Sequence, residues 1–186
     1  MCKDFTARRL THLEYKSIFF VCVNFIAYYL LKMFDQDEKF MRTAIQAAHK
    51  AKEFDEVPIG ACLINESGEI LASAFNQTIT RNDPTAHSEI LVLRQAGELV
   101  SNYRLTDTTI YTTIEPCIMC AGALVNARIR RLVFGANDKR FGAVRSLFQL
   151  CDNSSLNHRI EITGGILENE CKKLMQDFFR ERRLKI

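Results

Sequence analysis

Short segments rich in β-branched residues alternate with longer segments of helical periodicity through most of this chain. Strands that alternate with helices favour a sheet covered on both faces by helices. Strands are predicted at residues 59–65, 69–75, 108–114, 130–136 and 157–165. Helices are predicted at residues 35–54, 87–100, 117–128 and 168–183. The pattern therefore predicts an α/β fold, a three-layer α/β/α sandwich around a mixed five-stranded sheet.

The size and composition of the chain indicate one domain with an appendage. A length of 186 residues is enough to bury a core and too short for a second full domain. Hydrophobic residues make up 47% and charged residues 25% of the chain, which indicates neither an intrinsically disordered protein nor a membrane protein with several spans.

Charge is distributed unevenly along the sequence. Residues 33–127 contain 7 basic and 13 acidic residues, whereas residues 128–186 contain 13 basic and 7 acidic residues. The excess of positive charge in the carboxy-terminal part favours an anionic partner, and nucleic acid is the usual one. A surface of paired charges without such a partner would have the same totals.

The seven cysteines indicate a reducing compartment. Their number is odd, and apart from one C-x-x-C they lack the regular spacing of a disulfide-stapled secreted protein. We therefore expect a cytoplasmic protein with free thiols, buried or half-buried. These thiols are Cys2, Cys22, Cys62, Cys151 and Cys171.

An apolar run, IFFVCVNFIAYYLL, occupies residues 18–31 behind a basic segment. It resembles a signal or an anchor, but it is shorter than the roughly 20 residues that cross a bilayer, and no small-residue cleavage site follows it. We interpret residues 1–32 as an extension upstream of the true start and residues 33–186 as the functional domain. A membrane anchor and a helix packed on the domain are the alternatives. No stable membrane association is expected.

A pair of cysteines, Cys117 and Cys120, follows Pro116, a residue that suits the first turn of a helix. Residues three apart share one helix face, so both sulfurs can reach one ion near the positive end of the helix dipole. Zinc prefers such ligands, and His87, at another predicted helix start, would be the third. Three protein ligands leave the open position that a catalytic zinc keeps for water, whose pKa falls to roughly 7. We therefore predict one zinc ion per subunit.

Glu89 stands two residues after His87, at the start of the same predicted helix. A carboxylate beside the metal-bound water, but not bound to the metal, is a proton carrier, so Glu89 is the predicted general acid and base. Taken alone, a C-x-x-C motif is at least as often a redox or structural zinc motif. Together, H-S-E and E-P-C-I-M-C match the signature of zinc-dependent nucleobase deaminases.

Longer segments resemble one family. They are PTAHSEI, EPCIMCAGALVNARIRRLVFGANDKRFGAVRSLF, NHRIEITGGIL and DFFRERR. Together they resemble the bacterial tRNA-specific adenosine deaminases of the cytidine deaminase-like superfamily, from about residue 40 to residue 183. The first 32 residues have no counterpart in the family pattern. A second departure is Ser88, where the family usually has alanine; a small residue is tolerated there but can alter contacts beside the metal.

The resemblance implies a cytidine deaminase-like fold and the hydrolytic deamination of adenosine to inosine at the wobble position of a tRNA anticodon by zinc-bound hydroxide. It implies that His87, Cys117 and Cys120 bind zinc and that Glu89 moves protons. It also implies that Asn76 hydrogen-bonds the target base, although the residues alone favour a turn asparagine after a strand. The family's homodimers, with active sites near the subunit interface, imply a homodimer.

Two segments contain candidates for contacts with the tRNA anticodon stem-loop. The first follows the predicted strand 130–136 and contains Asp138, Lys139 and Arg140. The basic carboxy-terminal half favours contact with RNA. For the residues at the end of the last helix, the alternative is that Phe178 and Phe179 lie in the core and that the arginines form a solvated face. The second segment is the end of the last helix, with candidates Phe178, Phe179, Arg180, Arg182 and Arg183.

Two other functions fit parts of the pattern. A deaminase of a free base or nucleoside, such as guanine or cytosine, would share the zinc motif, although the basic last helix argues against it. A nonenzymatic, zinc-stabilised RNA-binding module would need a fourth protein ligand, for which Cys62, Cys151 and His158 are candidates. Such a module would leave Glu89 without a role.

Overall fold

The protein is described by a computed structural model, which covers the backbone of residues 12–184 and the side chains of residues 32–184. The chain divides into two compact units, Met1–Gln36 and Asp37–Ile186, and the sheet lies in the second. The interpretation of residues 1–32 as an upstream extension stays a prediction, and residues 1–11 lie outside the described part. The expected thiols Cys2 and Cys22 also lie outside the described side chains.

Helix α1 (His12–Glu53) begins much earlier than the sequence predicted. The predicted start at Asp35 is wrong, because Asp35 lies inside the helix. The chain contains no helix-breaking residue before Pro58, so nothing in the sequence separates the apolar run from the segment that follows it. A residue with capping chemistry marks a helix start only where the preceding residues leave the helical conformation.

The sheet has five strands in the order β2-β1-β3-β4-β5, which confirms the predicted mixed sheet. Strand β1 is antiparallel to both β2 and β3, whereas β3, β4 and β5 are parallel. Strand β2 therefore runs in the same direction as β3, β4 and β5, and the carboxyl ends of these four strands share one edge. The strands are β1 (Gly60–Ile64), β2 (Ile70–Phe75), β3 (Thr109–Ile114), β4 (Arg131–Ala136) and β5 (Glu161–Gly164).

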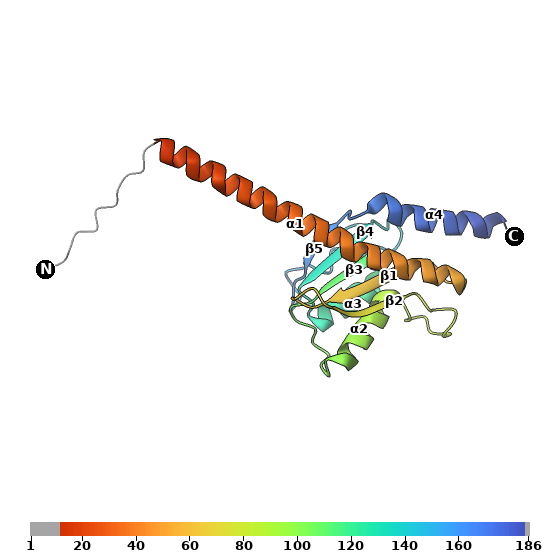
Figure 1. Cartoon of the computed structure of the whole chain (residues 1–186). Helices are drawn as coiled ribbons and strands as arrows, with labels where there is room; N and C mark the ends of the chain where they lie inside the picture. The colour runs from red at the N-terminus through yellow and green to blue at the C-terminus, as the bar shows by residue number, and fades with distance from the viewer. Residues whose placement is uncertain (1–11, 185–186) are drawn as a thin grey trace. The chain divides into compact units, whose positions relative to one another are not determined.

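Helices cover both faces of the sheet, as the alternating pattern predicted. Helices α2 (Ser88–Leu99) and α3 (Ile118–Ala127) lie on one face. Helix α4 (Glu168–Leu184) and the part of α1 after Asp37 lie on the other (Figure 1). None of the helices that the structure describes combines the length and apolar character needed to cross a membrane.

The structure has two hydrophobic cores, one on each face of the sheet. Both form because successive side chains of a strand point to opposite faces. Leu63 and Leu132 face α2 and α3, whereas their neighbours Cys62 and Val133 face α1 and α4. Gly60 lets α1 approach the sheet closely, because a Cβ atom there would lie 2.1 Å from the carbonyl oxygen of Ala44 on α1. The cores thereby hold the starts of α2 and α3 in place at one sheet edge.

Candidate active site

The predicted site residues converge because several of them follow strands whose carboxyl ends share one edge of the sheet. Asn76 directly follows β2, Cys117 comes soon after β3, and Asp138 comes soon after β4. In open α/β sheets, ligands bind beyond the carboxyl ends of the strands. The topology therefore brings to one edge residues that lie far apart in the sequence.

His87, Cys117 and Cys120 form a group that can hold a metal ion, and their ligand atoms all lie within 4.8 Å of one another. His87 and Cys117 occupy the N-cap positions of α2 and α3, and neither side chain caps its own helix. Cys120 lies one turn further along α3 and is buried. Both helix amino termini therefore direct their positive ends toward the group, which favours ionised sulfur.

The spacing of the three ligand atoms fits tetrahedral zinc. The Nδ1 atom of His87 lies 3.7 Å from Cys117 Sγ and 3.5 Å from Cys120 Sγ. Usual zinc bond lengths and a tetrahedral angle predict about 3.6 Å for such a nitrogen–sulfur pair. A small adjustment of side chains is therefore sufficient for all three atoms to bind one ion.

No fourth protein ligand joins this group among the residues with described side chains. Of the three candidates, Cys62 and Cys151 are buried in the two hydrophobic cores, and burial raises the pKa of each thiol to about 12. The Nε2 atom of the third, His158, contacts the carbonyl oxygen of Ile129 at 2.7 Å. In the part of the chain with described side chains, the group therefore offers three potential ligands, the number that a catalytic zinc site takes from the protein.

The two sulfurs differ in their affinity for protons. The hydrogen bond from Cys120, followed by the contact with His87, lowers the pKa of Cys117 to about 4. The same bond to Cys117, together with burial, raises the pKa of Cys120. Cys120 is therefore the sulfur that holds its proton more tightly, and Cys117 is the one that ionises first. Binding of a metal to both sulfurs must release a proton from Cys120.

Glu89 lies in the first turn of α2, and its side chain is only 4% exposed. Burial raises the pKa of its carboxyl group, while the hydrogen bond from the Ser88 hydroxyl lowers it. Glu89 is near enough to Cys120 and His87 to influence the pKa of both. A buried carboxyl with a raised pKa beside a metal group is suited to accept and return protons.

Asn76 is buried and connected to the same site through the backbone of α2. Its Oδ1 atom accepts a hydrogen bond of 2.9 Å from the N–H of Ser88, and its own N–H donates to the carbonyl of Ile59. Because Oδ1 accepts from the protein, the amide nitrogen is the donor that Asn76 can offer to a ligand. Whether it contacts a base stays a prediction, and only the family resemblance pointed to this residue.

Two buried glutamates near the site were missed in the sequence. Glu56 is fully buried and accepts hydrogen bonds from the hydroxyl of Thr78 and the N–H of Thr80, in the loop that follows Asn76. No sequence pattern distinguished it from the other acidic residues around it. The second, Glu115, precedes the Pro-Cys pair of the metal motif, and this position was the available signal.

The Glu115 carboxylate is held in its ionised form. Burial acts to raise its pKa, but hydrogen bonds from the Ser146 hydroxyl and from the N–H groups of Arg145, Ser146 and Asp138 outweigh burial, and the pKa lies below its usual value. This carboxylate therefore keeps its charge throughout the neutral range.

The first group of predicted RNA contacts lies in a tight turn after β4. Lys139 and Arg140 are exposed, and the guanidinium of Arg140 lies 5.9 Å from the ring centre of the exposed Phe141. Asp138 is partly buried, and its Oδ1 atom accepts hydrogen bonds from the N–H groups of Arg140 and Phe141. Asp138 therefore shapes the turn, while the two basic residues face solvent.

The second group, at the end of α4, is divided between core and surface. Phe178 is buried, whereas Phe179 is 43% exposed. Arg182 forms an ion pair of 2.7 Å with Asp55 and also donates to the backbone carbonyl of Asp55. Arg180 pairs with Asp177 on the same helix. The contacts of Phe179 and Arg182 with RNA stay predictions.

Known proteins are similar to this chain in sequence and in fold. The family model of MafB19-like deaminases matches residues 34–183. A tRNA-specific adenosine deaminase of Haemophilus influenzae is 46% identical over 147 residues, which cover 79% of this chain and 85% of that protein. A tRNA-specific adenosine deaminase of Bacillus subtilis is 45% identical over 150 residues, which cover 81% and 92% of the two chains.

A solved structure from studies of A-to-I editing by tRNA deaminases at the wobble position is also similar. It superposes with a TM-score of 0.70 at 42% identity and covers 73% of this chain and 98% of that chain. The family match includes all five strands, the metal group and the last helix up to residue 183, and residues 1–33 lie outside it. The chain therefore belongs to the MafB19-like deaminases by its family match and to the tRNA-specific adenosine deaminases by its relatives.

Proposed function

We propose that this protein deaminates adenosine to inosine at the wobble position of a tRNA anticodon. The observation that carries the proposal is the convergence of three metal ligands with one buried, unligated glutamate at the starts of α2 and α3. We infer the identity of the substrate from the relatives, because curated proteins at 46% and 45% identity are tRNA-specific adenosine deaminases.

In this proposal His87, Cys117 and Cys120 hold one zinc ion per subunit. The donor set of one imidazole and two sulfurs, spaced for a tetrahedral ion, supports zinc over the hard cations, which prefer oxygen ligands. When bound, zinc supplies a water whose pKa is lowered to about 7, and so a nucleophile at neutral pH.

Glu89 carries the protons of the reaction. Its carboxylate accepts one proton from the attacking water and delivers it to the adenine ring nitrogen. It then accepts the second proton, from the hydroxyl group added to the ring carbon, and delivers it to the departing amine. Water and adenosine are consumed, and inosine and ammonia are formed, so Glu89 ends the cycle unchanged. Its buried position beside the metal ligands supports this role.

We further propose that Asn76 holds the target base and that exposed basic residues hold the RNA. The amide of Asn76 offers a hydrogen-bond donor at the same sheet edge as the metal group. Lys139 and Arg140 offer positive charge to phosphates, and the exposed Phe179 offers a ring on which an unpaired base can stack. In this proposal Asp138 and Arg182 also contact the RNA, and each is held in place by a partner within the protein. Asp138 accepts a hydrogen bond from the N–H of Arg140, and Arg182 forms an ion pair with Asp55.

The proposed assembly is a homodimer in the cytoplasm. An open, mainly apolar groove of about 640 Å³ lies between α2 and α3. Its lining includes Tyr103, which is 70% exposed, and Leu99, next in sequence to the lining residue Glu98, is 65% exposed. Apolar patches of this kind favour association with another protein surface. A reducing compartment suits the zinc thiolates and the free thiols. Light scattering should report twice the chain mass of 21.4 kDa.

The decisive experiment measures inosine in total tRNA after incubation with zinc-loaded protein. Free adenosine, cytidine and guanine are tested in parallel, and the Glu89→Ala variant is the control. Inosine that forms only in tRNA, and only with wild-type protein, supports the proposal. Turnover of a free base would keep the zinc chemistry and reject the RNA substrate, and no turnover of any substrate would reject the enzyme.

A further inference from the structure

The carboxylate of Glu115 is the centre of a dense set of hydrogen bonds. Its Oε1 atom accepts from the N–H groups of Val144, Arg145 and Ser146 at 3.1, 2.7 and 2.8 Å. Its Oε2 atom accepts from the N–H of Asp138 at 3.0 Å and from the hydroxyl of Ser146. The side chain is 2% exposed, so these donors replace water around the charge.

All of these donors belong to one segment, residues 138–146, which we name the 138–146 loop. Gly142 shows how closely the loop surrounds the carboxylate, because a Cβ atom there would lie 2.4 Å from both Cδ and Oε2 of Glu115. The N–H of Ala143 donates to the carbonyl of Pro116 at 2.8 Å, and Gly142 pairs with Cys117 through an isolated bridge. The loop is thus wrapped around a buried negative charge beside the metal motif.

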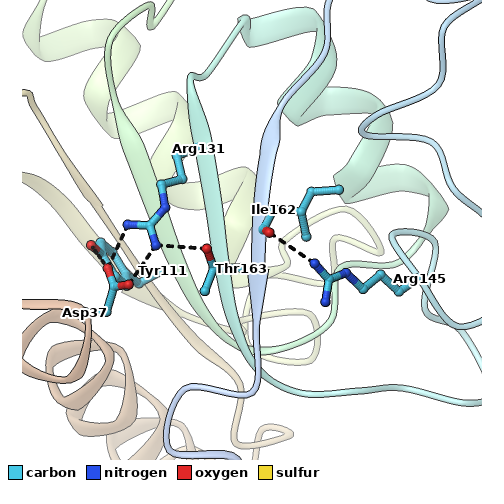
Figure 2. A network of polar contacts seen from close by, with 6 residues as sticks. All are labelled: Asp37, Tyr111, Arg131, Arg145, Ile162 and Thr163. Atoms are coloured by element: carbon cyan, nitrogen blue, oxygen red, sulfur yellow. Dashed lines mark hydrogen bonds and ion pairs between the residues drawn. The ribbon is translucent and has the colours of Figure 1, made fainter. Parts of the chain in front are cut away.

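The outer side of the 138–146 loop is exposed. Lys139, Arg140 and Phe141 face solvent between the two parts of the loop that Glu115 holds. The far end has a second attachment, because Arg145 donates a hydrogen bond of 3.1 Å to the carbonyl of Ile162 on β5 (Figure 2). The basic and aromatic side chains therefore project from a backbone that is tied on both sides.

We propose that Glu115 is a positioning residue that presents the 138–146 loop to RNA. This inference rests on the proposed function. A backbone held at residues 138 and 144–146 loses little conformational entropy when residues 139–141 bind a ligand, so the loop is preorganised for binding. Glu115 acts through the loop and touches neither the base nor the metal.

Helix α3, which carries Cys117 and Cys120 at its start, does not depend on the Glu115 side chain for its backbone geometry. The N–H of Ala121 bonds to the carbonyl of Cys117 at 2.8 Å, as in any first helical turn. The N–H of Glu115 itself bonds to the carbonyl of Ala136 at 2.8 Å and fixes the end of β3. A change confined to the carboxylate should therefore weaken RNA binding and leave zinc in place.

The test uses the full chain with zinc and total tRNA, and compares Glu115→Gln and Ser146→Ala with wild type. Glutamine keeps the shape of the side chain but sets an NH₂ group against the N–H of Asp138 when its oxygen serves residues 144–146. Alanine at 146 removes one hydroxyl donor only. The control is Glu66→Gln, which makes the same chemical change at an exposed residue of the β1–β2 turn.

For Glu115→Gln we expect the KM for tRNA to rise about tenfold with kcat within about threefold of wild type, because a loop that binds substrate affects binding more than chemistry. Bound zinc should stay at one ion per chain. Amide hydrogen exchange should become faster at Asp138, because its N–H loses the hydrogen bond to Oε2 of residue 115. Ser146→Ala should raise the KM about threefold, and Glu66→Gln should change none of these quantities.

Each result has a separate meaning. If wild-type protein forms no inosine in tRNA, the proposed function fails whatever the variants do. If wild type is active and Glu115→Gln keeps the wild-type KM, loses zinc, or loses kcat alone, the positioning role is overturned. If Glu115→Gln does not fold, Ser146→Ala decides alone, and an unchanged KM in that variant rejects the inference.

Discussion

The Ser88 hydroxyl donates a hydrogen bond of 2.9 Å to Oε2 of Glu89, and both side chains are buried. The N–H of Ser88 also donates to Asn76. Ser88 therefore connects the proposed proton carrier with the proposed base-binding residue. The Ser88 hydroxyl is therefore part of the immediate surroundings of the Glu89 carboxylate.

Replacing Ser88 with alanine should shift the acidic limb of kcat/KM to higher pH. The hydroxyl stabilises the ionised carboxylate and lowers the pKa of Glu89, so its loss raises that pKa further. Glu89 must be ionised to accept the first proton, and the rate is therefore lost at a higher pH as the solution is acidified. A pH–rate profile tests this, with Ser154→Ala, at an exposed loop position, as the control. An unshifted or downward-shifted limb would contradict it.

Replacing Glu89 with glutamine should abolish most of the activity while zinc stays bound. Glutamine fills the same space but cannot accept and return protons, and general acid–base catalysis contributes about 10²- to 10⁴-fold to a rate. Inosine formation and zinc content are measured on the same sample. Retention of more than about a tenth of the wild-type kcat would assign the proton transfer to another group.

Removal of zinc by a chelator should abolish deamination, and added zinc should restore it. Zinc binding to the apoprotein should release at least one proton, because the raised pKa of Cys120 keeps that sulfur protonated until the metal binds. Calorimetry in buffers of different ionisation enthalpy counts the protons. X-ray absorption should find three protein ligands, and a fourth would point to a structural site.

Replacing Arg131 with methionine should lower the free energy of unfolding by about 3–5 kcal/mol, because it leaves a buried aspartate without its cation. Arg131 binds Asp37 through two hydrogen bonds of 2.8 and 2.7 Å, and their side chains are only 13% and 6% exposed. The hydroxyls of Tyr111 and Thr163 complete this network, the first by donating to Asp37 and the second by accepting from Arg131 (Figure 2).

Urea unfolding measures the loss, and the matched control is the exposed pair of Arg42 with Glu170, where Arg42→Met should change stability by less than about 1 kcal/mol. The double change Arg131→Met with Asp37→Leu should recover part of the stability, since no buried charge then lacks a partner. A small effect of Arg131→Met alone would show that Asp37 finds other solvation.

A chain that starts at Met33 should fold and deaminate tRNA as the full chain does. Burial along α1 begins at Asp37 in the described side chains, and the deaminase family match begins at residue 34. Unfolding free energies of the two chains should agree within about 1 kcal/mol. Mass spectrometry of the native protein tests the related proposal that residues 1–32 precede the true start, which an intact Met1 would contradict.

Hydrophobic periodicity predicted the five strands and the last three helices. Each element buries part of its surface in a core, and this burial determines the spacing of its apolar residues along the sequence. The cysteine pair of the candidate metal group was equally visible, since Cys117 and Cys120 are three residues apart at a predicted helix start, and the structure brings His87 within reach of both. The start of α1 was not, because Asp35 has capping chemistry in a segment where the helix continues without a break.

What only the tertiary structure decided depends on groups that meet across long stretches of chain. Strand β2 runs parallel to β3 and β4, and this direction brings Asn76 to the sheet edge where the candidate metal ligands lie. No local sequence pattern encodes the direction of a strand. Glu115 stands directly before the Pro-Cys pair of the metal motif, but no local pattern showed that the 138–146 loop surrounds it with N–H donors. Local spacing determines which residues form an element, whereas the partners of a buried charge are determined by how the elements pack.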